Sequence, residues 1–149
     1  MSVVIAEQIN IGWVKSNPEA LFAFPDNLKE QGYGTLAGEI RKEKNTIGIP
    51  TMLDATTHIF DDMIGERLGP YHYSGPIGSY LVPRICRAFG QLLVHLRSGG
   101  TIVWPEAGMV TTENRLDVTA PVLLQAIEAS KMRVFQESVS ITRQQSTPN

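Results

Sequence analysis

Two segments far apart in the chain repeat one order of features, namely an apolar run, a turn of small residues and a helical run. In the first segment, residues 21–24 precede a turn that holds Gly32 and Gly34. In the second, residues 101–104 precede a turn that holds Gly108. When parallel strands each lead into a helix, such turns lie at the carboxyl edge of the sheet, where ligands bind. We therefore expect both turns to border one ligand crevice.

Each turn taken alone has a simpler interpretation. Gly32, Gly34 and Gly108 allow a positive φ in a connection, and that role requires no ligand. Short glycine patterns recur by chance, so either turn by itself favours the simpler interpretation. The presence of two such turns, each after an apolar run, favours a ligand site.

Apolar periodicity predicts that strands and helices alternate along the chain. Strands are expected at residues 2–5, 20–24, 47–51, 101–104 and 131–135, and helices at residues 9–15, 35–42, 79–97 and 120–130. Pro25 is expected to end the second strand, and Thr119 is expected to cap the last helix. This order predicts an α/β three-layer sandwich, Rossmann-like, with a mixed sheet flanked by helices. A single domain is expected at residues 1–135, followed by a polar C-terminal tail at 136–149 that frays.

The composition, with 42% hydrophobic and 19% charged residues among 149, is that of an ordinary globular chain. The formal net charge is −2, whereas domains that bind nucleic acid usually carry an excess of positive charge. No nucleic-acid partner is therefore expected. Because no apolar run approaches the length of a membrane span, we expect no membrane partner and a cytoplasmic location. The single cysteine, Cys86, excludes an internal disulfide, and its apolar helical surroundings predict a buried, inert thiol.

Residues 52–75 form the least regular segment, and loops of this length are often functional. Asp54, His58, Asp61 and Asp62 are residue types that ligate divalent metals, but acidic loops are common on protein surfaces. We therefore expect neither a metal nor another cofactor. Arg41 could pair with a phosphate or with a neighbouring glutamate, but Glu39 and Lys42 on the same helix favour a solvated face.

Several motifs together resemble an uncharacterised bacterial and phage family. They are residues 22–28 (Phe-Ala-Phe-Pro-Asp-Asn-Leu), 32–34 (Gly-Tyr-Gly), 45–51 (Asn-Thr-Ile-Gly-Ile-Pro-Thr) and 102–112 (Ile-Val-Trp-Pro-Glu-Ala-Gly-Met-Val-Thr-Thr). The family carries the series Phe-Gly-Asp-Asn-Leu, Gly-x-Gly-Gly, Arg, Asn-x-x-Gly-Ile-Pro-Thr-Lys and Pro-x-Asp-Gly-Ile-Gly-Thr-Gly, and Arg41 matches its arginine. Here Pro25, Thr35 and Met52 replace two glycines and a lysine of that pattern.

This layout is in turn similar to macro domains, which bind ADP-ribose and related nucleotides. The resemblance implies a macro-domain-like fold, with Asn27 near a ribose and the second turn wrapped around a diphosphate. At the position of the family's Gly-Thr-Gly, this chain has Val110, Thr111 and Thr112. Without the two glycines the backbone cannot approach a phosphate closely, but the threonine hydroxyls could supply other hydrogen-bond donors. The expected ligand-binding residues are Asp26, Asn27, Gly32, Tyr33, Gly34, Thr51, Glu106, Ala107, Gly108, Met109, Val110, Thr111 and Thr112.

Individual residues of that set keep two interpretations. Asp26 could accept a hydrogen bond from an adenine amine or a ribose hydroxyl, but Asp26-Asn27 is also good turn chemistry. Tyr33 could stack on a base or anchor its loop. Glu106 could act as a base or bind ribose hydroxyls, although a carboxylate repels a phosphate placed too near.

Three functions remain open at this point. The first is a non-catalytic binder of an ADP-ribose-class nucleotide, which the resemblance extends to a phage counter-defence sponge that sequesters a nucleotide immune signal. The second is a hydrolase of ADP-ribose derivatives, with Asp26, Asn27 or Glu106 positioning a water. The third is a protein-interaction module with a degenerate pocket. Whether the chain forms a homo-oligomer is also open.

Overall fold

The computed structural model describes residues 2–32 and 35–146, with side chains as far as residue 139. Its main sheet has four strands in the order β1-β6-β2-β3, and every pairing in it is parallel. The strands are β1 (Ser2–Ala6), β2 (Ala20–Asn27), β3 (Thr46–Met52) and β6 (Thr101–Pro105). The expected α/β class with helices flanking a sheet is confirmed, but the expected mixed sheet is wrong. Each connection between strands contains a helix, and a helical crossover returns the chain in the same direction.

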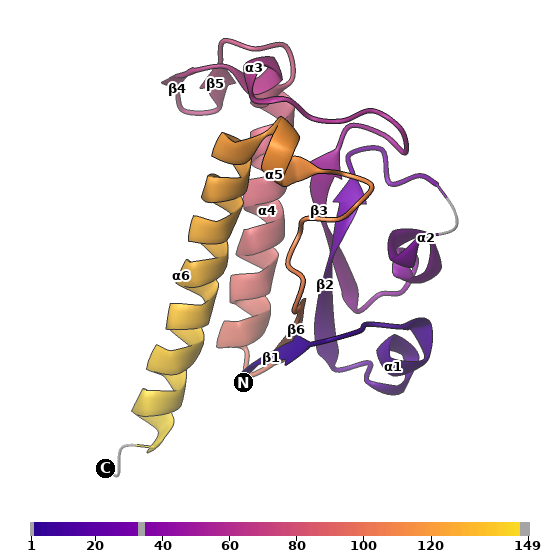
Figure 1. Cartoon of the computed structure of the whole chain (residues 1–149). Coiled ribbons are helices and arrows are strands. Elements are labelled where there is room, and N and C mark those ends of the chain that lie inside the picture. Colours follow the sequence, from indigo (N-terminus) through magenta and orange to yellow (C-terminus); the bar gives the residue numbers. More distant parts are fainter. Residues whose placement is uncertain (1, 33–34, 147–149) are drawn as a thin grey trace.

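Helices cover both faces of this sheet, as Figure 1 shows. On one face α1 (Ile11–Ser16) and α2 (Leu36–Ile40) pack against Phe22 and Phe24. On the opposite face lie α4 (Gly78–Arg97) and α6 (Pro121–Ser146), which share the larger core cluster. The first two helices are short and the second two are long, so most apolar burial lies on the α4 and α6 face.

Helix α4 forms where its apolar residues recur at helical spacing, as expected. Leu81, Ile85, Phe89 and Leu92 are buried against the sheet. Cys86, however, is exposed, so the expected buried thiol is wrong. The residue after Ile85 is turned about 100° around the helix axis, which takes it off the buried stripe.

Helix α6 is one continuous helix, so the closing strand expected at residues 131–135 is wrong. Leu123, Ile127 and Val134 are all buried, and their separations of four and seven residues continue a single helical face through the expected strand. The helix also runs on to Ser146, although the polar sequence from residue 136 predicts a fraying tail.

None of the helices in the described part of the chain combines the length and the apolar character that a membrane span requires.

Strand β2 continues through Pro25 to Asn27, although proline was expected to end it. The reason lies in the direction of the backbone groups. The N–H of Phe22 donates to Asn45 beside β3, so alternation along the strand turns the nitrogen of Pro25 towards β6. The β2–β6 ladder ends at Phe22 and Val103, and therefore no ladder bond is lost at Pro25.

The segment at 52–75 holds a short helix α3 (Asp61–Ile64) and an antiparallel hairpin of β4 (Arg67–Gly69) and β5 (His72–Tyr73).

Asp61 caps α6, because its carboxylate accepts the N–H groups of Val122 and Leu123 at 2.9 and 3.0 Å. The expected cap, Thr119, ends the short helix α5 (Leu116–Thr119), and its buried hydroxyl finds no hydrogen-bond partner among the described residues. The first residue of α3, about sixty positions earlier in the chain, therefore supplies the cap that the local sequence predicts at Thr119.

Candidate functional site

The two turns identified from sequence follow neighbouring strands that separate at their carboxyl ends. The ladder between β2 and β6 covers only residues 20–22 with 101–103, while both strands continue further. After β2 the chain enters α2 on one face, and after β6 it enters α5 and α6 on the opposite face (Figure 1). Adjacent parallel strands that lead to opposite faces form a topological switch point, which is where open α/β sheets bind ligands.

A crevice of about 470 Å³ lies at this point and is lined by both turns. From the first turn and the strand before it come Asp26, Asn27 and Gly32, and from the second Ala107, Gly108, Val110 and Thr111. Thr51 at the end of β3 also contributes. The expectation that both turns border one crevice is therefore confirmed. Arg41, expected on the solvated face of its helix, also lies in the wall. Further wall residues that no sequence pattern singled out are Glu7, Gln8, Ile9, Gln31, Ala55, Glu113 and Asn114.

The first turn is closed by its own asparagine. The side-chain amide of Asn27 donates to the carbonyl of Gln31 at 2.6 Å, and its oxygen accepts the N–H of Gln31 at 3.2 Å. Gly32 follows with a φ of +114°, a conformation that L side chains rarely adopt. The turn thus depends on Asn27 for its shape, and the amide group that would orient a ribose is engaged within the turn.

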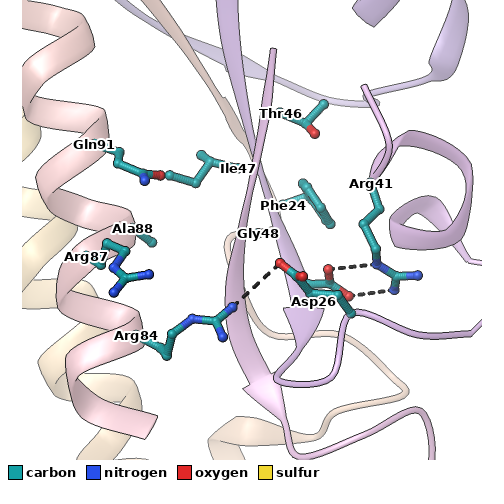
Figure 2. A pocket seen from close by; sticks show the side chains of 11 residues that line it. Phe24, Asp26, Arg41, Thr46, Ile47, Gly48, Arg84, Arg87, Ala88 and Gln91 are labelled. Atoms are coloured by element: carbon teal, nitrogen blue, oxygen red, sulfur yellow. Dashed lines mark hydrogen bonds and ion pairs between the residues drawn. The ribbon is translucent and has the colours of Figure 1, made fainter. Parts of the chain in front are cut away.

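Asp26 is bound to Arg41, which contradicts the expectation of a solvated arginine. The guanidinium forms two parallel hydrogen bonds to the carboxylate, at 2.9 and 2.6 Å (Figure 2). The carboxylate also accepts the N–H of Asn27 at 2.8 Å. Because these donors occupy both carboxylate oxygens, Asp26 holds the wall of the crevice in place and is poorly available as an acceptor for a base.

The second turn is held by the buried Asn114. Its Oδ1 accepts the N–H of Thr111 at 3.0 Å. Its Nδ2 donates to the carbonyl of Met109 at 2.7 Å and to Oγ1 of Thr51 at 3.0 Å. The Thr51 hydroxyl in turn donates to the carbonyl of Asp26 at 3.2 Å. This chain of hydrogen bonds joins the second turn to the ends of β2 and β3.

Not every expected binding residue borders the crevice. Met109 is fully buried in the larger core cluster, so its side chain is not part of the crevice wall. Glu106 and Thr112 are exposed outside the crevice wall, and the N–H of Glu106 donates to the carbonyl of Ala6 at 2.8 Å. Tyr33 and Gly34 lie outside the described residues.

The acidic residues of the 52–75 segment serve separate local structures. Asp54 accepts hydrogen bonds from Thr56 and Thr57, and these bonds lower the pKa of its carboxyl. His58 contacts the carbonyl of Glu113 at 2.9 Å, which ties this segment to the second turn. Within residues 2–32 and 35–139, no three His, Cys, Asp or Glu side chains gather in a group that could hold a metal ion.

Comparison with known proteins assigns the chain to a family without giving it a function. Residues 4–130 match a family of unknown function, DUF7831, and the chain belongs to that family. No curated protein and no solved structure matches it.

Proposed function

We propose that this DUF7831 member binds a nucleotide of the ADP-ribose class in the crevice between the two turns and holds it without hydrolysis. One observation carries the proposal: the turns after β2 and β6, about eighty residues apart in sequence, border the same hollow at a topological switch point. The similarity of the sequence motifs to macro domains supports the nucleotide class.

The size and walls of the crevice support a ligand of this kind. A volume of about 470 Å³ falls among those of small-molecule sites, which span roughly 300–1,000 Å³. Ile9, Leu36, Met52 and Val110 supply apolar wall on which a base or ribose can pack. A few polar groups among apolar walls are typical of cofactor and nucleotide pockets.

The charges around the crevice favour one orientation of the ligand. Glu7 and Glu113 are exposed wall residues, and their carboxylates can accept hydrogen bonds from ribose hydroxyls. A phosphate must lie away from them, because like charges repel strongly in a partly dry site. We therefore place the phosphates beside the backbone of Ala107, because the N–H of Gly108 already donates to the carbonyl of Pro105 at 2.9 Å.

Sequestration is the biological role that this proposal implies, as for a phage protein that removes a nucleotide immune signal. The hydrolase alternative needs a group free to activate water. Asp26 and Asn27, two of the residues that would do so, are held in hydrogen bonds with Arg41 and Gln31. This favours a binding protein over an enzyme.

Calorimetric titration with ADP-ribose, its cyclic isomers and cyclic dinucleotides tests the proposal. Ligand released by heating should be recovered intact by chromatography. Ala107→Trp fills the crevice from an exposed wall position and should abolish binding. Ala126→Trp, on the exposed face of α6, is the matched control and should bind normally.

Other outcomes would overturn the proposal in distinct ways. Conversion of the nucleotide to a new product, lost in Asn27→Ala, would establish the hydrolase. Failure of the folded wild-type chain to bind any nucleotide in a broad thermal-shift panel would favour the protein-interaction module. Equal loss of binding in both tryptophan variants would place the ligand elsewhere.

A further inference from the structure

A second, smaller hollow of about 240 Å³ lies along the outer edge of β3, between that strand and α4. Figure 2 shows side chains of α4, Arg84, Arg87 and Gln91, on one side of it and the Asp26–Arg41 pair on the other. Its volume is below the range of sites that hold drug-sized ligands. An occupant must therefore be a small group.

The charged groups that line this hollow are not balanced. Three guanidinium groups (Arg41, Arg84 and Arg87) face two carboxylates (Asp26 and Glu30), which leaves one positive charge. Among the described residues no carboxylate lies within ion-pair distance of Arg87. The hollow is thus lined by a cation whose charge is not neutralised by the protein.

Arg84 is only weakly engaged. Its Nη2 lies 3.6 Å from Oε1 of Glu30, and the two side chains are 40% and 61% exposed. Exposed ion pairs at such distances contribute little stability, so a competing anion can displace Glu30. Arg84 and Arg87 are also one turn apart on α4, where like charges repel unless an anion lies between them.

The edge of β3 adds backbone donors to this wall. In the β2–β3 ladder, alternate residues of β3 pair with β2, and the N–H of Phe22 donates to the carbonyl of Asn45. The N–H groups of Thr46 and Gly48 consequently point away from β2, towards the open edge. An N–H group beside two guanidinium groups is a suitable donor set for an oxyanion.

We propose that this hollow is a phosphate-binding site in which Arg84 and Arg87 hold the phosphate oxygens. Arginine forms paired hydrogen bonds with phosphate, and a dianion neutralises both guanidinium groups. The phosphate enters as inorganic phosphate or as the terminal group of a phosphomonoester. This site is separate from the nucleotide crevice, although Asp26 and Arg41 lie in the walls of both.

Titration calorimetry of the full chain with inorganic phosphate, with phosphoserine and with sodium chloride at matched ionic strength tests the site. Phosphate is expected to bind and to raise the thermal midpoint, whereas chloride does neither. Arg87→Gln and Arg84→Gln should each weaken phosphate binding about tenfold, because each removes a charge-assisted contact. Binding of inorganic phosphate alone identifies a free anion as the ligand, and binding of phosphoserine identifies a phosphomonoester.

Arg133→Gln is the matched control, since Arg133 is an exposed residue of α6 outside the hollow and loses the same charge. It should change phosphate affinity less than about twofold. Equal weakening in Arg133→Gln and Arg87→Gln, or no binding of either phosphate compound to the folded chain, would overturn the site. The circular dichroism spectrum of each variant checks that it folds. Binding of ADP-ribose in the crevice is measured separately, so failure of one site does not imply failure of the other.

Discussion

Arg41 and Asp26 form a nearly buried, bidentate ion pair, with Nε 2.9 Å from Oδ2 and Nη2 2.6 Å from Oδ1. The side chains are 15% and 3% exposed. Arg41 also donates to the carbonyls of Gly32 and Gln31, each at 3.3 Å. The pair therefore connects the end of β2, the first turn and the residue after α2.

We expect Asp26→Asn to lower the free energy of unfolding by about 3–5 kcal/mol, because it leaves the guanidinium of Arg41 without its counter-ion. Urea denaturation at neutral pH measures the effect. The double variant Asp26→Asn, Arg41→Met removes both charges and should recover most of the loss. A loss in the single variant below about 0.5 kcal/mol, the size seen at ordinary surface sites, would show that the pair does not hold the fold.

Asn114→Ala removes the bonds that tie the second turn to the ends of β2 and β3. The turn loses its acceptor for the N–H of Thr111, and the carbonyl of Met109 loses its donor. Buried groups left without partners cost about 1–3 kcal/mol each, so the free energy of unfolding should fall by at least about 2 kcal/mol. Thermal unfolding measures this loss. Asn10→Ala removes an exposed helix cap and should lower the free energy of unfolding by about 1 kcal/mol. An equal loss in Asn10→Ala and Asn114→Ala would contradict the role of Asn114 in holding the second turn.

Asp61→Ala should lower the free energy of unfolding by about 1–2 kcal/mol, because the first N–H groups of α6 lose their acceptor. Asp61→Asn should cost less, since its amide oxygen still accepts. Asp62→Ala is the control next to it, an exposed position at which the change should stay within about 0.5 kcal/mol. Chemical denaturation of the three variants compares them, and equal effects at both positions would refute the cap.

Two glycine-to-alanine substitutions should have opposite signs. At Gly48 a Cβ would lie 2.9 Å from the Cβ of Asp26 and 3.3 Å from the ring of Phe24, so overpacking should cost about 1–3 kcal/mol. At Gly90, within α4, a Cβ meets nothing within 4 Å, and alanine should stabilise by about 0.5–1 kcal/mol. Thermal midpoints of the two variants check the signs. Destabilisation at both positions would mean that the packing around Gly90 is tighter than described.

Local sequence patterns predicted most of the elements, because apolar periodicity is a property of neighbouring residues. The stripe on α4 and the strands around β2, β3 and β6 are recognisable for this reason. Where a local rule failed, packing or strand pairing decided the outcome. Residues 131–135 continue α6 because Ile127 and Val134 share a buried face, and Pro25 stays in β2 because its nitrogen needs no partner.

Two glycine-bearing turns after apolar runs can be recognised from the order of residues alone, and they were enough to predict a shared crevice. The side chains that close its walls, in contrast, depend on contacts that exist only in the folded chain. Arg41 is hydrogen-bonded to Asp26, which lies fifteen positions earlier in the chain, and Asn114 is hydrogen-bonded to Thr51, which lies sixty-three positions earlier. The Thr111-x-x-Asn114 spacing indicates a turn but not the partner that the asparagine reaches. The reason is physical: a pattern along the chain reports which face of an element is apolar, whereas a hydrogen-bond partner depends on which elements the fold brings together.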